Sequence, residues 1–157
     1  MTPHVASMRN LISWSLVHLA VWLVAVSPPA SSAARQGLVP QLRARALDQD
    51  CCDTAELVLA EVLNNIVKHA YRGRGGSIGI ALRVCGTQVA FRITDCGRPM
   101  PEGRLPDGPL PENRPGTPVS EGGYGWFLIR SLSRGLHYRR DGDRNILSFQ
   151  VACGARP

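Results

Sequence analysis

Apolar residues recur at helical spacing through one run of the chain, from Ala55 to Tyr71. Because each residue turns a helix by roughly 100°, Glu61, Asn65 and His69 share one polar stripe. The neighbouring stripe is apolar and is predicted to pack against a sheet; it comprises Leu59, Val62, Leu63, Ile66, Val67 and Ala70. A polar stripe of this kind is typical of an ordinary solvated helix face, so any chemical role for it depends on motifs elsewhere in the chain.

Alternation of apolar and polar residues predicts two antiparallel hairpins. Residues 77–84 and 87–94 form the first, and residues 135–140 and 145–151 form the second. An apolar helix over 125–133 separates them. With an N-terminal strand and helix, the pattern predicts an α+β two-layer sandwich, in which about five strands form an antiparallel or mixed sheet with about three helices on one face.

Two glycine-bearing segments lie downstream of the polar helix stripe. Asp95 ends an alternating strand, where a carboxylate can accept a hydrogen bond from an exocyclic amine, and Gly97 allows close approach to a flat ring. Gly122, Gly123 and Gly125 lead into the apolar helix, whose free N–H groups and positive dipole end suit phosphate. Each signal is weak alone, because strands commonly end in turns and glycines commonly form flexible caps.

Composition narrows the classes of partner. The chain of 157 residues has a formal net charge of +6, and every basic residue except Lys68 is an arginine. The arginines are scattered through predicted helices, loops and strands, so we expect no direct nucleic-acid binding. The five cysteines show no metal-ligand spacing, and Cys51 and Cys52 are adjacent, so we expect reduced thiols in a cytoplasmic protein.

The helix motif with Glu61, Asn65 and His69, the Asp95 to Gly97 step and the later glycines occur in a specific order. This ordered set resembles the ATP-binding boxes of the Bergerat-fold (GHKL) ATPases. Within that superfamily the motifs are most similar to those of the anti-sigma-factor serine kinases. The resemblance covers roughly residues 19–151 and implies the histidine kinase-like ATPase fold, with ATP and Mg²⁺ as cofactors.

The resemblance also implies roles for the helix residues. Asn65 would ligate Mg²⁺ that bridges the nucleotide phosphates, as an amide oxygen can. Glu61 would be the general base that takes the proton from the attacking hydroxyl. His69 would contribute to ATP binding as a positioning residue. Lys68 lies near the same stripe and is a candidate phosphate contact, although a solvated lysine explains it as well.

For the glycine segments the resemblance implies nucleotide contacts. Asp95 would accept a hydrogen bond from the adenine amine, and Gly97 would lie beneath the adenine ring. The phosphates would be lined by the three glycines before and within the next helix, Gly122, Gly123 and Gly125.

Seven of the twelve prolines lie between residues 97 and 123, with little apolar periodicity. Such composition predicts a flexible loop, and the resemblance implies an ATP lid over residues 98–121. Arg104 and Arg114 are candidate γ-phosphate contacts, because a guanidinium fork suits a phosphate. Several family members carry an arginine just before the glycines, whereas Ser120 and Glu121 stand here, so the resemblance supports ATP binding more strongly than catalysis.

The resemblance implies a serine/threonine protein kinase that doubles as an anti-sigma factor. Its partners would be a sigma factor and a STAS-domain anti-anti-sigma factor, whose serine it would phosphorylate. Two alternatives stay open: a non-catalytic, ATP-gated switch that binds a partner, and an exported protein whose motifs match by accident. A homodimer is also open, because family members tend to dimerise, and no membrane association is expected.

The apolar run at residues 11–26 has two interpretations. With Arg9 before it and small residues after it, the run fits a signal peptide cleaved near Ala34. Alternatively residues 18–26 form the first strand and residues 32–47 a helix, which the resemblance implies and which we favour. The expected domain then spans residues 18–152, between tails at 1–17 (with Met8 as an alternative start) and 153–157.

Overall fold

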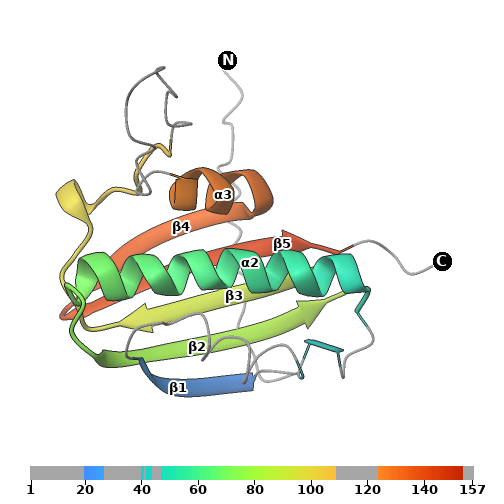
Figure 1. Ribbon diagram of the computed structural model, residues 1–157, viewed down its shortest axis with the longest axis horizontal. Coiled ribbons are helices and arrows are strands. Elements are labelled where there is room, and N and C mark those ends of the chain that lie inside the picture. The colour runs from blue at the N-terminus through green and yellow to red at the C-terminus, as the bar shows by residue number, and fades with distance from the viewer. Residues whose placement is uncertain (1–19, 27–39, 41, 44–46, 109–123, 154–157) are drawn as a thin grey trace, which may run out of the picture.

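The computed structural model describes residues 20–26, 40, 42–43, 47–108 and 124–153 (Figure 1). The elements in chain order are β1 (Ala20–Val26), α2 (Gln49–Asn65), a π-helical turn η1 (Ile66–Ala70), β2 (Gly76–Cys85), β3 (Gln88–Asp95), a 3-10 turn η2 (Pro101–Gly103), α3 (Tyr124–Leu132), β4 (Arg134–Asp141) and β5 (Arg144–Ala152). Among the described residues, no helix has both the length and the apolar composition needed to cross a membrane.

Five strands form one sheet in the order β1-β2-β3-β5-β4, and every neighbouring pair is antiparallel. Helix α2 runs along the strands over one face of the sheet, and α3 lies next to β4 (Figure 1). The predicted α+β two-layer sandwich is therefore confirmed. The predicted helix over 32–47 falls mostly outside the described residues, although Pro40, Leu42 and Arg43 are helical and Leu42 is buried in the core.

Residues 20–26 of the N-terminal apolar run form strand β1, in agreement with the strand that we favoured, and residues 11–19 lie outside the described part of the chain. β1 pairs with β2 along its whole length, from Ala20 opposite Leu82 to Val26 opposite Gly76. β1 is therefore an edge strand of the sheet, paired with β2 on one side.

Helix α2 begins six residues before the predicted start at Ala55, because Asp48 caps it. The Oδ1 atom of Asp48 accepts a hydrogen bond of 2.7 Å from the backbone N–H of Cys51, which satisfies one of the free donors of the first turn. The predicted apolar stripe is buried, apart from Ala70, which is half-buried against the core. The helix ends in the π turn, where the N–H of Tyr71 donates to the carbonyl of Ile66 at 2.9 Å.

The core lies between α2, α3 and one face of the sheet. Phe91 of β3 and Phe149 of β5 stack with ring centroids 4.9 Å apart at its centre, and both are fully buried. Ile129 contributes the buried side chain of α3. The alternation predicted for the strands is thus the alternation between this core and the opposite face.

The prediction that all cysteines are reduced is wrong at two positions. Cys51 and Cys153 form a disulfide across a sequence separation of 102 residues, while Cys52, Cys85 and Cys96 are free thiols. The fold brings the first turn of α2 against the residue directly after β5. Spacing along the chain carries no information about a contact between residues so far apart.

Candidate functional site

One end of the sheet collects polar side chains from three strands. Asp95, the last residue of β3, lies opposite Asn145 of β5, which lies opposite Arg140 of β4. Directly opposed residues of antiparallel strands share a face. The C-terminal end of α2 lies at this same end of the sheet (Figure 1).

A bulge in β4 puts its side chains in register with this site. β4 carries one extra residue relative to β5 in the stretch between Arg134 and His137. Gly135 has a φ of +60° there, as is typical of a glycine bulge. Because successive side chains alternate across a strand, the extra residue turns Tyr138 and Arg140 to the face that carries α2.

Asp95 is the buried acid of the site, with only 5% of its surface exposed. Its Oδ1 atom accepts two hydrogen bonds of 2.8 Å, from the backbone N–H of Gly97 and from Nδ2 of Asn145. Burial raises the pKa of the carboxyl above its ordinary value, and these two hydrogen bonds partly oppose that rise. Both bonds end on Oδ1, so Oδ2 is the atom available to a ligand.

Asn145 fixes the orientation of that acid. Its side-chain oxygen accepts hydrogen bonds from the hydroxyl of Tyr138 at 2.8 Å and from Nη1 of Arg140 at 2.7 Å. Its Nδ2 atom also donates to the carbonyl of Arg98 at 3.0 Å. With both ends of the amide engaged, Asn145 cannot rotate without breaking several bonds, and Asp95 is held in one orientation.

A cavity of about 490 Å³ opens between these strand ends and α2. Asn65 and His69 line it from the helix side, and Asp95 lines it from the sheet side. Its walls are otherwise largely apolar and include Val62, Ile66, Met100, Trp126 and Leu147. A mainly apolar hollow with a few convergent polar groups is the usual form of a small-molecule site. The structure therefore brings together three of the residues singled out by the sequence.

Asn65 has an unusual environment at the edge of this cavity. Its Nδ2 atom is buried and has no hydrogen-bond partner among the described residues. A buried amide without a partner costs about 1–3 kcal/mol, and the two ends of an amide can exchange by rotation. The side-chain amide of Asn65 can therefore form a hydrogen bond or a coordination bond to a bound ligand.

Glu61 and Gly125 lie together, next to Asn65 and outside the lining of the cavity. A Cβ atom added to Gly125, in the first turn of α3, would lie 2.8 Å from Oε2 of Glu61 and 3.7 Å from Oδ1 of Asn65. The glycine thus allows the backbone of α3 to approach the polar stripe of α2. Glu61, Asn65 and Gly125 are therefore neighbours. The sequence resemblance links them to nucleophile activation, cation binding and phosphate binding, respectively.

Gly97 has a packing role that the sequence did not indicate. A Cβ atom at this position would lie 2.7 Å from Cβ of Ala70 and 2.9 Å from its carbonyl carbon. Gly97 is absent from the lining of the cavity around Asp95. Its lack of a side chain is needed where the loop after β3 crosses the end of η1, and the predicted place beneath an adenine ring stays a prediction.

The remaining predicted contacts are less central or fall outside the described residues. Lys68 and Arg104 are exposed and do not line the cavity around Asp95. Arg114, Gly122 and Gly123 lie outside the part of the chain that the structure describes.

The first part of the predicted lid, residues 98–108, packs against the domain. The N–H of Met100 donates to the hydroxyl of Tyr138 at 3.1 Å, and Nε of Arg130 donates to the carbonyl of Pro106 at 2.7 Å. Leu105 packs against the core. These contacts fix the near end of the segment against α3 and β4, and the lid function stays a prediction.

Sequence reasoning missed Asn145, Tyr138 and Arg140. A signal for the first was present, because Asn145 occupies the same alternating phase of β5 as the buried Leu147 and Phe149. A polar residue in a buried phase usually has a specific partner. The other two depend on the bulge in β4, which alternation alone does not predict.

Comparison with known proteins finds a family model, a curated relative and solved structures that resemble this chain. The family model described as the histidine kinase-like ATPase domain matches residues 24–151. The serine-protein kinase RsbW of Halalkalibacterium halodurans is 30% identical over 94 residues, which are 59% of this chain and 57% of that protein. The match therefore spans little more than half the length of this curated relative. A solved structure, the blue-light activated histidine kinase of Erythrobacter litoralis EL346, is 25% identical with a TM-score of 0.45, over 68% of this chain and 31% of that one.

Proposed function

This chain belongs to the family of histidine kinase-like ATPase domains, and we propose that its cavity beside Asn65 and Asp95 binds ATP together with Mg²⁺. The observation that carries the proposal is the environment of Asp95. A buried carboxylate with Oδ1 fully engaged and Oδ2 available can accept one hydrogen bond from a ligand inside a mainly apolar cavity.

Such an acceptor favours adenine over guanine. The exocyclic amine of adenine can donate to Oδ2 of Asp95, whereas the corresponding group of guanine is a carbonyl oxygen that a carboxylate repels. Asn145 keeps the carboxylate in place, because it donates to Oδ1 at 2.8 Å. The raised pKa of Asp95 reflects its burial.

The other end of the site suits phosphates and a cation. The amide of Asn65, whose Nδ2 has no hydrogen-bond partner among the described residues, has an oxygen that can ligate Mg²⁺. The first turn of α3 at Gly125 has backbone N–H groups for phosphate. The described residues include no group of three His, Cys, Asp or Glu side chains that could hold a metal ion. A cation here would depend on Asn65, phosphate oxygens and water, which is common for Mg²⁺.

We further propose that the protein is a serine/threonine protein kinase and an anti-sigma factor. The support is its similarity to the serine-protein kinase RsbW and the position of Glu61 beside Gly125 and Asn65. ATP, when bound, would supply the γ-phosphoryl group. Glu61 would accept the proton of a serine hydroxyl on a STAS-domain anti-anti-sigma partner, and a sigma factor would be the protein held inactive.

A non-catalytic switch is the second candidate function. Ser120 and Glu121 precede the glycines where several family members carry an arginine. Without that cation the transition-state charge would have one fewer stabilising group. In this alternative, ATP binding would control the affinity for a protein partner without phosphoryl transfer.

Calorimetry tests the nucleotide site. We expect ATP with Mg²⁺ to bind much more tightly than GTP, and Asp95→Asn to weaken ATP binding roughly tenfold to hundredfold, because a hydrogen bond to a charged group is lost. Asp143→Asn, an exposed acid in the turn between β4 and β5, is the matched control and should bind normally. Equal affinity of Asp95→Asn and the wild-type protein for ATP would remove the assignment.

Paired substitutions test the cation and the base. Asn65→Ala should lose the Mg²⁺ dependence of ATP binding, whereas Asn64→Ala, its exposed neighbour, should keep it. Glu61→Ala should retain ATP binding and lose phosphoryl transfer to a partner when γ-labelled ATP is supplied. If the wild-type protein binds ATP and labels no candidate partner, the switch is the better proposal.

A further inference from the structure

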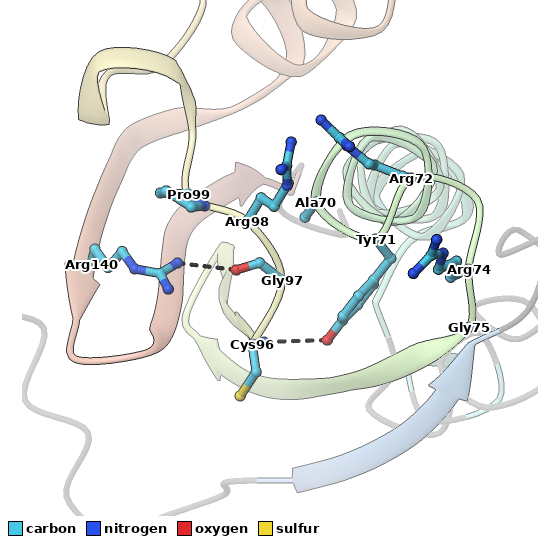
Figure 2. A pocket seen from close by; sticks show the side chains of 10 residues that line it. All are labelled: Ala70, Tyr71, Arg72, Arg74, Gly75, Cys96, Gly97, Arg98, Pro99 and Arg140. Carbon is cyan, nitrogen blue, oxygen red and sulfur yellow. Dashed lines mark hydrogen bonds between the residues drawn. The ribbon is translucent and has the colours of Figure 1, made fainter.

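A second cavity, of about 580 Å³, lies beside the first and is lined by arginines (Figure 2). Arg72 and Arg74 reach it from the segment after η1, Arg98 from the loop after β3, and Arg140 from β4. No acidic side chain lines it among the described residues. Arginines from three parts of the fold therefore line one open hollow, which we call the arginine cavity.

Three of these four arginines have side chains without a polar partner among the described residues. Within the described part of the chain, the side chains of Arg72, Arg74 and Arg98 make no hydrogen bond or ion pair. Arg140 differs, because its Nη1 donates to the carbonyl of Gly97 at 3.1 Å and to Asn145. Because no acidic side chain lines the cavity among the described residues, its arginines give it a positive potential that attracts an anion.

Three backbone carbonyl groups near the cavity have hydrogen-bond donors within the protein. Carbonyl groups at the end of a helix carry partial negative charge, and three of those near the arginine cavity already accept hydrogen bonds from backbone N–H groups. The carbonyl of Ala70 accepts from the N–H of Arg98 at 3.0 Å, and the carbonyl of Val67 accepts from the N–H of Gly73 at 2.8 Å. The carbonyl of Tyr71 likewise accepts from Arg74.

Arg72 has a backbone conformation that non-glycine residues rarely adopt, with a φ of +55°. This left-handed conformation costs an arginine about 1 kcal/mol or more. The side chain at this position lines both the arginine cavity and the cavity beside Asp95. A glycine would adopt this conformation at lower cost, so the presence of arginine points to a role for its side chain.

We propose that the arginine cavity binds an acidic segment of a partner protein through carboxylate side chains. A small-molecule site normally encloses most of its ligand, whereas all four arginines here are exposed. A protein segment brings its own surface to cover the contact, and guanidinium forks match carboxylates with paired hydrogen bonds. The net charge of +6 favours approach of such a partner. This inference does not depend on nucleotide binding.

Fluorescence anisotropy of the full chain with a short dye-labelled glutamate-rich peptide tests the proposal. Arg74 lines only the arginine cavity, so Arg74→Ala should weaken peptide binding about fivefold, and Arg74→Glu should weaken it further. The matched control is Arg134→Ala, an exposed arginine of β4 that lines neither cavity, and it should bind like the wild-type protein. Added salt should weaken binding, because screening reduces the attraction between exposed charges.

Four results would overturn the proposal. Three of them are no peptide binding by the wild-type protein, equal binding by Arg74→Ala, and equal losses in Arg74→Ala and Arg134→Ala. Displacement of the peptide by inorganic phosphate at lower concentration would also overturn it, and would assign the cavity to small phosphates. Circular dichroism confirms that each variant is folded. Calorimetry with ATP separates this proposal from the nucleotide site, since Arg74→Ala should bind ATP normally.

Discussion

Substituting Gly97 by alanine tests why a glycine lies just beyond the buried acid. The added Cβ would lie 2.7 Å from Cβ of Ala70, 2.9 Å from its carbonyl carbon and 3.0 Å from its oxygen. Two of these atoms are backbone, and the same carbonyl oxygen holds the N–H of Arg98 at 3.0 Å. Neither side of the contact can therefore move without breaking a hydrogen bond.

The magnitude is set by two opposing effects. Overpacking of this kind costs about 1–3 kcal/mol, and the reduced freedom of the unfolded chain returns about 0.4–1 kcal/mol. We therefore expect Gly97→Ala to lower the free energy of unfolding by about 1–2 kcal/mol, which is a fall in Tm of roughly 3–6 °C for a domain of this size. Thermal and urea unfolding followed by circular dichroism measure both quantities.

Gly79→Ala is the matched control. A Cβ atom at Gly79 would lie 3.7 Å from Cβ of Thr94, which is an ordinary contact, so this variant should be at least as stable as the wild-type protein. If Gly97→Ala kept the wild-type Tm but lost affinity for ATP, the packing explanation would be refuted. The glycine would then serve the adenine ring, as the sequence resemblance implies.

Three further predictions concern the acid, the start of α3 and the cysteines. Burial raises the pKa of Asp95 above its ordinary value of 3.8, so the native state holds this proton more tightly than the unfolded state does, and stability should fall as pH rises through the interval between the two values. Asp95→Asn should lack this fall in urea unfolding measured from about pH 4 to about pH 7. Gly125→Ala should change Tm little, because the one contact of the added Cβ below 3.4 Å is to the flexible carboxylate tip of Glu61 at 2.8 Å, yet it should slow phosphoryl transfer by displacing that base. Reduction of the Cys51 to Cys153 disulfide should destabilise the fold by up to about 4–5 kcal/mol, because the bridge closes a loop of about 100 residues, and thiol titration of the unreduced, denatured chain should find three thiols.

Each of these has a result that would contradict it. Parallel pH profiles for Asp95→Asn and the wild-type protein would mean that burial does not shift this acid. A large loss of Tm in Gly125→Ala would mean that Glu61 cannot move aside. Five titratable thiols without reductant would exclude the disulfide in the purified protein.

The local elements of this protein are determined by the order of its residues. The apolar stripe of α2 repeats at helical spacing, and β2 with β3 and β4 with β5 alternate around short turns, so each could be recognised within a window of about 20 residues. The polar stripe with Asn65 and the strand end at Asp95 were recognised for the same reason. Hydrophobic periodicity is a local property, and these features depend on little else.

The tertiary structure decided which residues meet. The pairing of Asp95 with Asn145 joins positions 50 residues apart, and the bulge at Gly135 determines which side of β4 faces them. The disulfide and the contact of Gly97 with Ala70 likewise depend on how separate elements pack. Sequence periodicity specifies which face of an element is buried, but long-range register depends on the packing of the whole sheet and its helices, and that packing alone creates the two cavities.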